Sequence, residues 1–123
     1  MFFEPHLRNH GLSHDPFNAI VAPRPIGWIS TRAKDGRLNL APYSYFNALA
    51  SNPWLIMFSA SHEKDSIAFA QESGEFVANL VSAPLLESMI ASSVDAPRGT
   101  SEFDYAKLTP EPGRLVSAPR VKE

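Results

Sequence analysis

Proline and glycine cut the first half of the chain into short apolar runs, and this pattern constrains the fold more than any other feature. The segment Ala22-Pro23-Arg24-Pro25 cannot lie inside a helix, because proline lacks the backbone N–H that a helix needs. Residues 26–31 follow and are rich in β-branched and aromatic side chains, which is typical of a strand. Asp35-Gly36 predicts a tight hairpin turn, because glycine tolerates the positive φ of such turns. We therefore expect a partner strand at residues 38–45.

Further strands are predicted on both sides of this hairpin. Residues 54–58 form a continuous apolar run after the Asn52-Pro53 break, as in a strand that is buried on both faces. We expect this strand to be central in the sheet. Residues 75–81 return to strand character, and the short apolar run at residues 17–21 brings the strand candidates to about five.

Two helices are predicted in the second half. Residues 65–73 place apolar side chains on one helical face, Asp65 can cap the start, and Gly74 follows the end. A second amphipathic helix is predicted to start at Ser82, because Pro84 suits a first turn. Its apolar positions have helical spacing: Leu85, Leu86, Met89 and Ile90.

The last part of the chain, residues 96–123, loses this periodicity and contains several prolines. No closing strand or helix is predicted there. An antiparallel sheet of about five strands has to close or cover its edges. We therefore expect strands to be missing from the carboxyl end or to come from another subunit. The prediction is one mainly β domain with two helices over residues 1–123, incomplete at its C-terminus.

Composition excludes several kinds of site. The chain has no cysteine, so disulfides, thiolate metal sites and a cysteine nucleophile are ruled out. The net charge of −2 is too small to indicate a nucleic-acid partner. Three of the four histidines fall in the first fourteen residues, where Pro5 and Gly11 oppose a helix, so no metal site is predicted. No apolar run is long enough for a signal sequence or membrane span, which favours a cytoplasmic protein.

No catalytic residue is predicted. Ser30 and Ser44 have no histidine nearby in sequence, and glycine-rich nucleotide motifs, P-loops and zinc-protease motifs are absent. The polar residues instead gather where the predicted strands end, in Ser30-Thr31, residues 39–44 and residues 59–66. The third segment suits a phosphate, because it has serines, Lys64 and a helix start. The first two suit a planar aromatic ligand, and Trp28 or Tyr43 offers a ring face. The alternative is that each serine only caps a turn.

The order of these motifs identifies a family resemblance. From residue 17 to residue 82 the chain is similar to the flavin reductase-like, FMN-binding split-barrel family, and beyond that more loosely. The motifs that carry the resemblance are residues 23–31, Gly36, residues 39–47, Lys64-Asp65-Ser66 and residues 74–79. The resemblance implies an antiparallel, Greek-key-like split barrel in a homodimer, with flavin near the subunit boundary.

The resemblance also implies the residues of an FMN site. These are Trp28, Ser30, Thr31, Asn39, Ala41, Pro42, Ser44, Ser59, Lys64, Asp65 and Ser66. Ser30, Thr31 and residues 39–44 would contact the flavin ring and ribityl chain. Ser59, Lys64 and Ser66 would hold the phosphate, while Asp65 would mainly cap the helix. The family usually has Lys-Asp-Thr where this chain has Lys64-Asp65-Ser66, which keeps the hydroxyl.

The implied function is an NAD(P)H-dependent flavin oxidoreductase. A hydride would pass from NADH or NADPH to N5 of FMN, and the electrons would then go to an acceptor protein or a monooxygenase component. One alternative is an FMN-binding electron carrier of the flavoredoxin type. Another is a ligand-free, truncated remnant that only dimerises.

Overall fold

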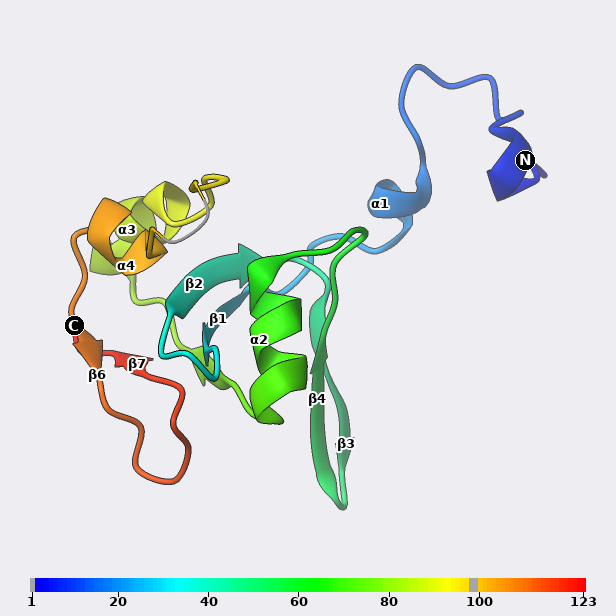
Figure 1. The fold of residues 1–123 in the computed structure, drawn as a ribbon. Coiled ribbons are helices and arrows are strands. Elements are labelled where there is room, and N and C mark those ends of the chain that lie inside the picture. The colour runs from blue at the N-terminus through cyan, green and yellow to red at the C-terminus, as the bar shows by residue number, and fades with distance from the viewer. Residues whose placement is uncertain (1, 98–99) are drawn as a thin grey trace.

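The computed structural model describes residues 2–97 and 100–123, which form three small antiparallel sheets and several short helices (Figure 1). The largest sheet has the order β2-β1-β5, so β1 is its central strand. Its strands are β1 (Gly27–Arg32), β2 (Leu38–Tyr43) and β5 (Val77–Asn79). The second sheet is the hairpin of β3 (Phe46–Ser51) and β4 (Trp54–Phe58). The third pairs β6 (Pro110–Glu111) with β7 (Arg120–Val121).

The predicted β1–β2 hairpin is confirmed. The two strands pair over six residues, from Gly27 opposite Tyr43 to Arg32 opposite Leu38. The turn closes with a hydrogen bond of 2.9 Å from the backbone N–H of Ala33 to the carbonyl of Arg37. Gly36 has a φ of +95° at this turn, which explains why glycine is needed there.

The prediction that residues 54–58 form a central, doubly buried strand is wrong. Within residues 2–97 and 100–123, β4 pairs only with β3, and Figure 1 shows this hairpin projecting beside α2. Trp54 is 90% exposed, and Leu55 and Ile56 are about half exposed. An apolar run indicates that its side chains favour burial, but a two-stranded ribbon provides no second layer to cover both of its faces. β3 itself was not predicted, because its alanines lack the β-branched signal and its extended form depends on pairing with β4.

Helix α2 (Asp65–Ser73) has the predicted bounds. Gly74 ends it in the left-handed conformation, with φ +77°, and donates its N–H to the carbonyl of Ala70. The prediction that Asp65 caps the start is wrong. Lys64 occupies the N-cap position with extended dihedral angles, and Asp65 is already the first helical residue, where its carboxylate cannot reach back as a cap. No described side chain caps this end.

The second predicted helix forms as the 3₁₀ turn η2 (Ala83–Leu85) followed by α3 (Leu86–Ala91), and Pro84 lies in its first turn as expected. Residues 17–21 do not form a strand. They contain the short helix α1 (Phe17–Ile20), which follows Pro16 at the N-cap. A run of five residues with four apolar side chains cannot distinguish a strand from one helical turn by periodicity.

The carboxyl-terminal residues fold, in contrast to the prediction. α4 (Glu102–Tyr105) starts at Ser101, whose hydroxyl accepts the backbone N–H of Phe103 at 3.3 Å. Phe103 is 1% exposed and packs with Trp28, Leu40, Ala106 and Leu108 in the hydrophobic core. Elements of two to four residues are too short for apolar periodicity to reveal them. This segment therefore contributes to the core that lies on the sheet of β1 and β2.

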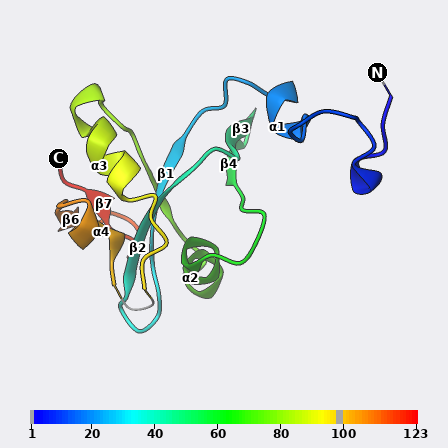
Figure 2. The ribbon, with the colours of Figure 1, turned by 90° about the horizontal axis from the view of Figure 1, so that it is seen from above.

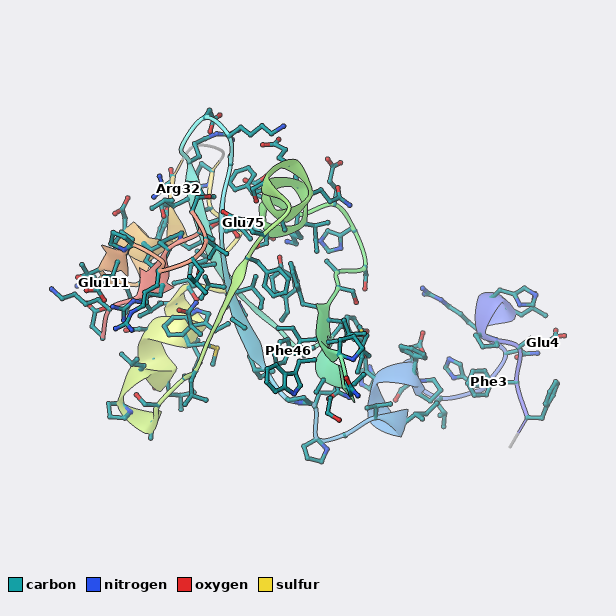
Figure 3. All side chains as sticks on the ribbon, turned by 90° about the horizontal axis from the view of Figure 1, so that it is seen from below. Phe3, Glu4, Arg32, Phe46, Glu75 and Glu111 are labelled. Carbon is teal, nitrogen blue, oxygen red and sulfur yellow. The ribbon has the colours of Figure 1, made fainter. Side chains whose placement is uncertain are left out.

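The amino-terminal arm runs away from the sheets, past η1 (Pro5–Leu7) and α1 (Figure 2). Phe3 and Glu4 lie far out on this arm, whereas Phe46 lies at the β3–β4 hairpin (Figure 3). No helix in the described part of the chain is both long and apolar enough to cross a membrane. The same residues contain no cluster of three or more histidine, aspartate or glutamate side chains suited to a metal ion.

Candidate functional site

A cavity of about 300 Å³ opens between the start of α2 and the outer part of β2. Its wall brings together six of the eleven predicted cofactor-binding residues, from two segments that are far apart in the sequence. They are Asn39, Ala41, Pro42, Lys64, Asp65 and Ser66. The strand contributes Asn39 and then the mainly apolar Ala41, Pro42 and Tyr43, and the helix contributes its first turn. The structure thus gathers the residues predicted at the ends of these two elements.

The first turn of α2 borders this cavity and begins with backbone N–H groups that no described side chain caps. The Lys64 carbonyl accepts the N–H groups of Ile67 and Ala68, both at 3.0 Å. The earlier N–H groups, those of Asp65 and Ser66, lie at the positive end of the helix dipole. Lys64 extends its ammonium group to Asp95, and this hydrogen-bonded ion pair raises the pKa of Lys64 and lowers that of Asp95. Because Asp95 is 87% exposed, the lysine can exchange this partner for another anion at little cost.

A buried hydrogen-bond network lies behind the cavity wall. The carboxylate oxygen Oε2 of Glu102 accepts the side-chain Nδ2 of Asn39 at 2.9 Å and the backbone N–H of Leu40 at 3.2 Å. The hydroxyl of Ser66 donates to Oδ1 of Asn39. Glu102 is 7% exposed, and burial raises the pKa of its carboxyl group, with a smaller contribution from the charge of Asp65. α4 is thereby linked to β2 and to the start of α2.

Sequence reasoning missed Glu102 as a site residue. It lies in the proline-rich segment for which no element was predicted, 63 residues after Asn39. The pattern Ser101-x-x-Asp104 was the one local signal, because a serine followed by an acid three residues later is typical of a helix start. That signal indicates the helix but not the partner of its buried carboxylate.

Ser44 and Ser59 line a different, more apolar cavity of about 500 Å³. It lies between α1 and the base of the β3–β4 hairpin, and its wall includes Tyr45, Phe46 and Met57. Tyr43 lines the first cavity and its neighbour Ser44 lines the second. The two cavities therefore flank the short connection from β2 to β3.

Three of the predicted cofactor-binding residues lie in the interior and do not line either cavity: Trp28, Ser30 and Thr31. None of them has exposed surface. The indole Nε1 of Trp28 donates to the hydroxyl of Ser92 at 2.9 Å, and Ser30 donates to the carbonyl of Pro119. Thr31 Oγ1 has no hydrogen-bond partner among the residues described. These three residues belong to β1, the central strand that pairs with β2 along one edge.

Comparison with known proteins identifies the family. A family model described as a flavin reductase like domain matches residues 21–123. An uncharacterized protein from Aquifex aeolicus is 43% identical over 109 residues, which cover 85% of this chain and 56% of the relative. The chain belongs to the flavin reductase-like family. It spans about half the length of the curated relatives that it matches.

Solved structures confirm the predicted split-barrel fold of this flavin reductase-like chain. Nitrilotriacetate monooxygenase component B from Bacillus cereus is 33% identical and superimposes with a TM-score of 0.83, covering 99% of this chain and 62% of that one. Flavoredoxin of Desulfovibrio vulgaris is 24% identical, with a TM-score of 0.77, and the match covers 84% of this chain and 56% of that one. This second likeness concerns the fold alone.

Proposed function

We propose that residues 1–123 are a single flavin reductase-like domain that binds FMN and acts in an NAD(P)H-dependent flavin oxidoreductase. The observation that carries this proposal is the cavity at the start of α2, where Asn39, Lys64 and Ser66 meet. In this proposal the FMN phosphate lies beside Lys64 and the first N–H groups of the helix.

The residues present fit a phosphate at this place. A phosphate needs a cation and several N–H donors, and the lysine and the uncapped first turn of α2 supply both. The volume of about 300 Å³ is at the lower end of the range of ligand pockets. Four carboxyl groups also line the cavity: Glu63, Asp65, Asp95 and Glu102. Lys64 is the one cation among the described residues that line the cavity, and it is paired with Asp95. It must therefore leave Asp95 to neutralise a phosphate.

The flavin ring requires a flatter and more apolar surface than the phosphate. Ala41, Pro42 and Tyr43 supply such a wall in the first cavity, and Ser44 and Ser59 add polar groups at the apolar second cavity. We propose that ring-edge contacts come from this stretch of β2 and its connection to β3. The residues of β1 then act by holding β2 in place, since Thr31 pairs with Asn39 and Ser30 with Leu40.

Bound FMN supplies the redox chemistry, because its ring accepts a hydride from NADH or NADPH and passes the electrons on. The chain has only to bind and orient the cofactor, so no side chain is assigned as an acid or base. The likeness to a monooxygenase component supports a monooxygenase partner as the electron acceptor. A flavoredoxin-like carrier that does not use nicotinamide is the competing function, and a ligand-free remnant is the third.

We also propose a homodimer in which a second copy covers the β3–β4 hairpin. Trp54, Leu55, Ile56 and Leu49 are between 47% and 90% exposed, and a two-stranded ribbon is marginal by itself in water. The hairpin residues Phe46 and Met57 line the second cavity, so a partner on this surface would lie beside Ser44 and Ser59. This agrees with the flavin position near a subunit boundary that the family resemblance implies.

The test is a titration of the purified protein with FMN, followed by addition of NADH or NADPH without oxygen. We expect saturable FMN binding and loss of the oxidised flavin absorbance with at least one nicotinamide. Bound flavin that neither nicotinamide bleaches would indicate the carrier. Failure to bind FMN would overturn the proposal and leave the remnant.

A further inference from the structure

The buried network behind the cavity has a fixed hydrogen-bond direction when Glu102 is ionised. A carboxylate only accepts hydrogen bonds, so the Asn39 amide must turn its Nδ2 toward Glu102. Its Oδ1 then faces Ser66 and accepts the only hydrogen of that hydroxyl. In this state Ser66 has lone pairs but no hydrogen for a ligand in the cavity.

Protonation of Glu102 at Oε2 permits the opposite direction, which the ionised carboxylate forbids. The protonated Oε2 can donate to Asn39 Oδ1 while it still accepts the N–H of Leu40. The Asn39 amide then turns over and offers Nδ2 to the Ser66 oxygen, which frees the Ser66 hydrogen. Ser66 forms the cavity wall from a buried position, so the freed hydrogen can turn toward the cavity, which loses one negative charge at the same time.

We propose that Glu102 is a positioning residue that couples proton binding to anion binding at the start of α2, by setting the direction of the Asn39–Ser66 hydrogen bond. This inference rests on the proposed function, because the anion is the phosphate of FMN. The inference makes the affinity of the site for FMN depend on pH. It also adds to the site Glu102, which acts through Asn39 and Ser66 and does not itself contact the cofactor.

The surroundings of Glu102 favour this coupling. The charged and titratable groups described on the surrounding elements are Asp65 and Lys64 at the start of α2, Tyr43 on β2, Arg37 just before β2, Glu63 and Asp95 at the cavity, and Asp104 on α4 itself. Two of these seven are cations, and each is already paired, Lys64 with Asp95 and Arg37 with Asp35. Glu102 is the buried member of the carboxyl groups that line the cavity, and burial already raises its pKa. A phosphate placed nearby would raise this pKa further, so that FMN binds more tightly as the pH falls through it.

The test compares FMN affinity in steps from about pH 4.5 to pH 8.5 in the parent protein and in Glu102→Gln. Glutamine keeps an oxygen that accepts both Leu40 and Asn39, but it cannot titrate. A rise of one pKa unit on binding corresponds to a tenfold difference in affinity between the two protonation states. The dissociation constant should therefore increase more from the acid to the alkaline end of this range in the parent than in Glu102→Gln, about tenfold more for each pKa unit by which bound phosphate raises the Glu102 pKa. Titration of the phosphate itself, with a second pKa of about 6, contributes equally to both.

Glu87→Gln is the matched control, because Glu87 is exposed on α3 and should retain the pH dependence of the parent. Equal pH dependence in the parent and in Glu102→Gln would overturn the coupling while leaving FMN binding intact. Absence of FMN binding at every pH would overturn both this inference and the proposed function.

A second measurement uses the same two proteins. Titration calorimetry in two buffers of different ionisation enthalpy reports the protons taken up when FMN binds. The measurement is repeated from about pH 4.5 to pH 8, because burial raises the Glu102 pKa above its ordinary value. We expect FMN binding to take up more protons in the parent than in Glu102→Gln within this range, since titration of the phosphate is common to both. Equal proton uptake in the two proteins at every pH would contradict the coupling.

Discussion

The hydrogen bond between Trp28 and Ser92 is expected to be worth a measurable part of the stability of the domain. Both side chains are 0% exposed, and the bond of 2.9 Å is the one that satisfies the indole N–H within the described structure. Ser92→Ala removes the acceptor but hardly changes the volume, so the N–H becomes buried without a partner. Such a loss costs about 1–3 kcal/mol. We therefore expect the free energy of unfolding to fall by this amount.

Urea unfolding followed by circular dichroism measures this quantity, and the slope with urea should not change because the surface exposed on unfolding is the same. Ser93→Ala is the matched control. The Ser93 hydroxyl is exposed and donates to the carbonyl of Ile90 at 2.7 Å, so its removal should change stability by less than about 0.5 kcal/mol. The reasoning is refuted if both variants unfold at the same urea concentration.

Three further predictions concern the cavity, the hairpin and the acid range. Lys64→Met should weaken FMN binding about tenfold or more, as expected for a lost charged hydrogen bond. Asp95→Asn should tighten FMN binding, because it frees the lysine from its ion pair. Unchanged affinities in a fluorescence titration would contradict both expectations. If the proposed homodimer forms through the β3–β4 hairpin, Trp54→Glu should yield a monomer in light scattering, and a monomeric parent would contradict the proposal. The Glu75 carboxylate accepts the backbone N–H and the hydroxyl of Ser117, and these hydrogen bonds lower the pKa of Glu75. The contribution of Glu75 to stability is therefore present above its unfolded pKa of about 4.3 and is lost as the pH falls through its folded pKa. Glu75→Gln should flatten the acid side of a pH–stability curve, and an unchanged curve would show that this bond is not formed in solution.

The elements that the sequence predicted correctly are those with local signals. The Asp35-Gly36 turn and the left-handed Gly74 both depend on glycine at one position, so a short window is enough to find them. The hairpin of β1 and β2 and helix α2 followed from these signals. The opposite case is β4, whose burial depends on which other layers lie over it. Nothing within residues 54–58 encodes that information.

The part of the candidate site that was predictable is the part formed by polar residues on β2 and at the start of α2. Asn39 and Lys64 come together because the outer part of β2 lies beside the start of α2. The interior position of Trp28 was not predictable, because an aromatic side chain on a strand suits either a ligand or a core. Glu102 was not predictable either, since only its contacts with a distant strand reveal its role.

The most direct test of the phosphate position is amide NMR of the labelled protein with FMN and with riboflavin. The two ligands share the ring and differ in the phosphate, so the difference between their spectra reports where the phosphate lies. We predict that this difference is largest at the backbone amides of Asp65 and Ser66 and at the side-chain amide of Asn39. A difference centred on β6 and β7, or spread evenly over the domain, would contradict an FMN site at the start of α2.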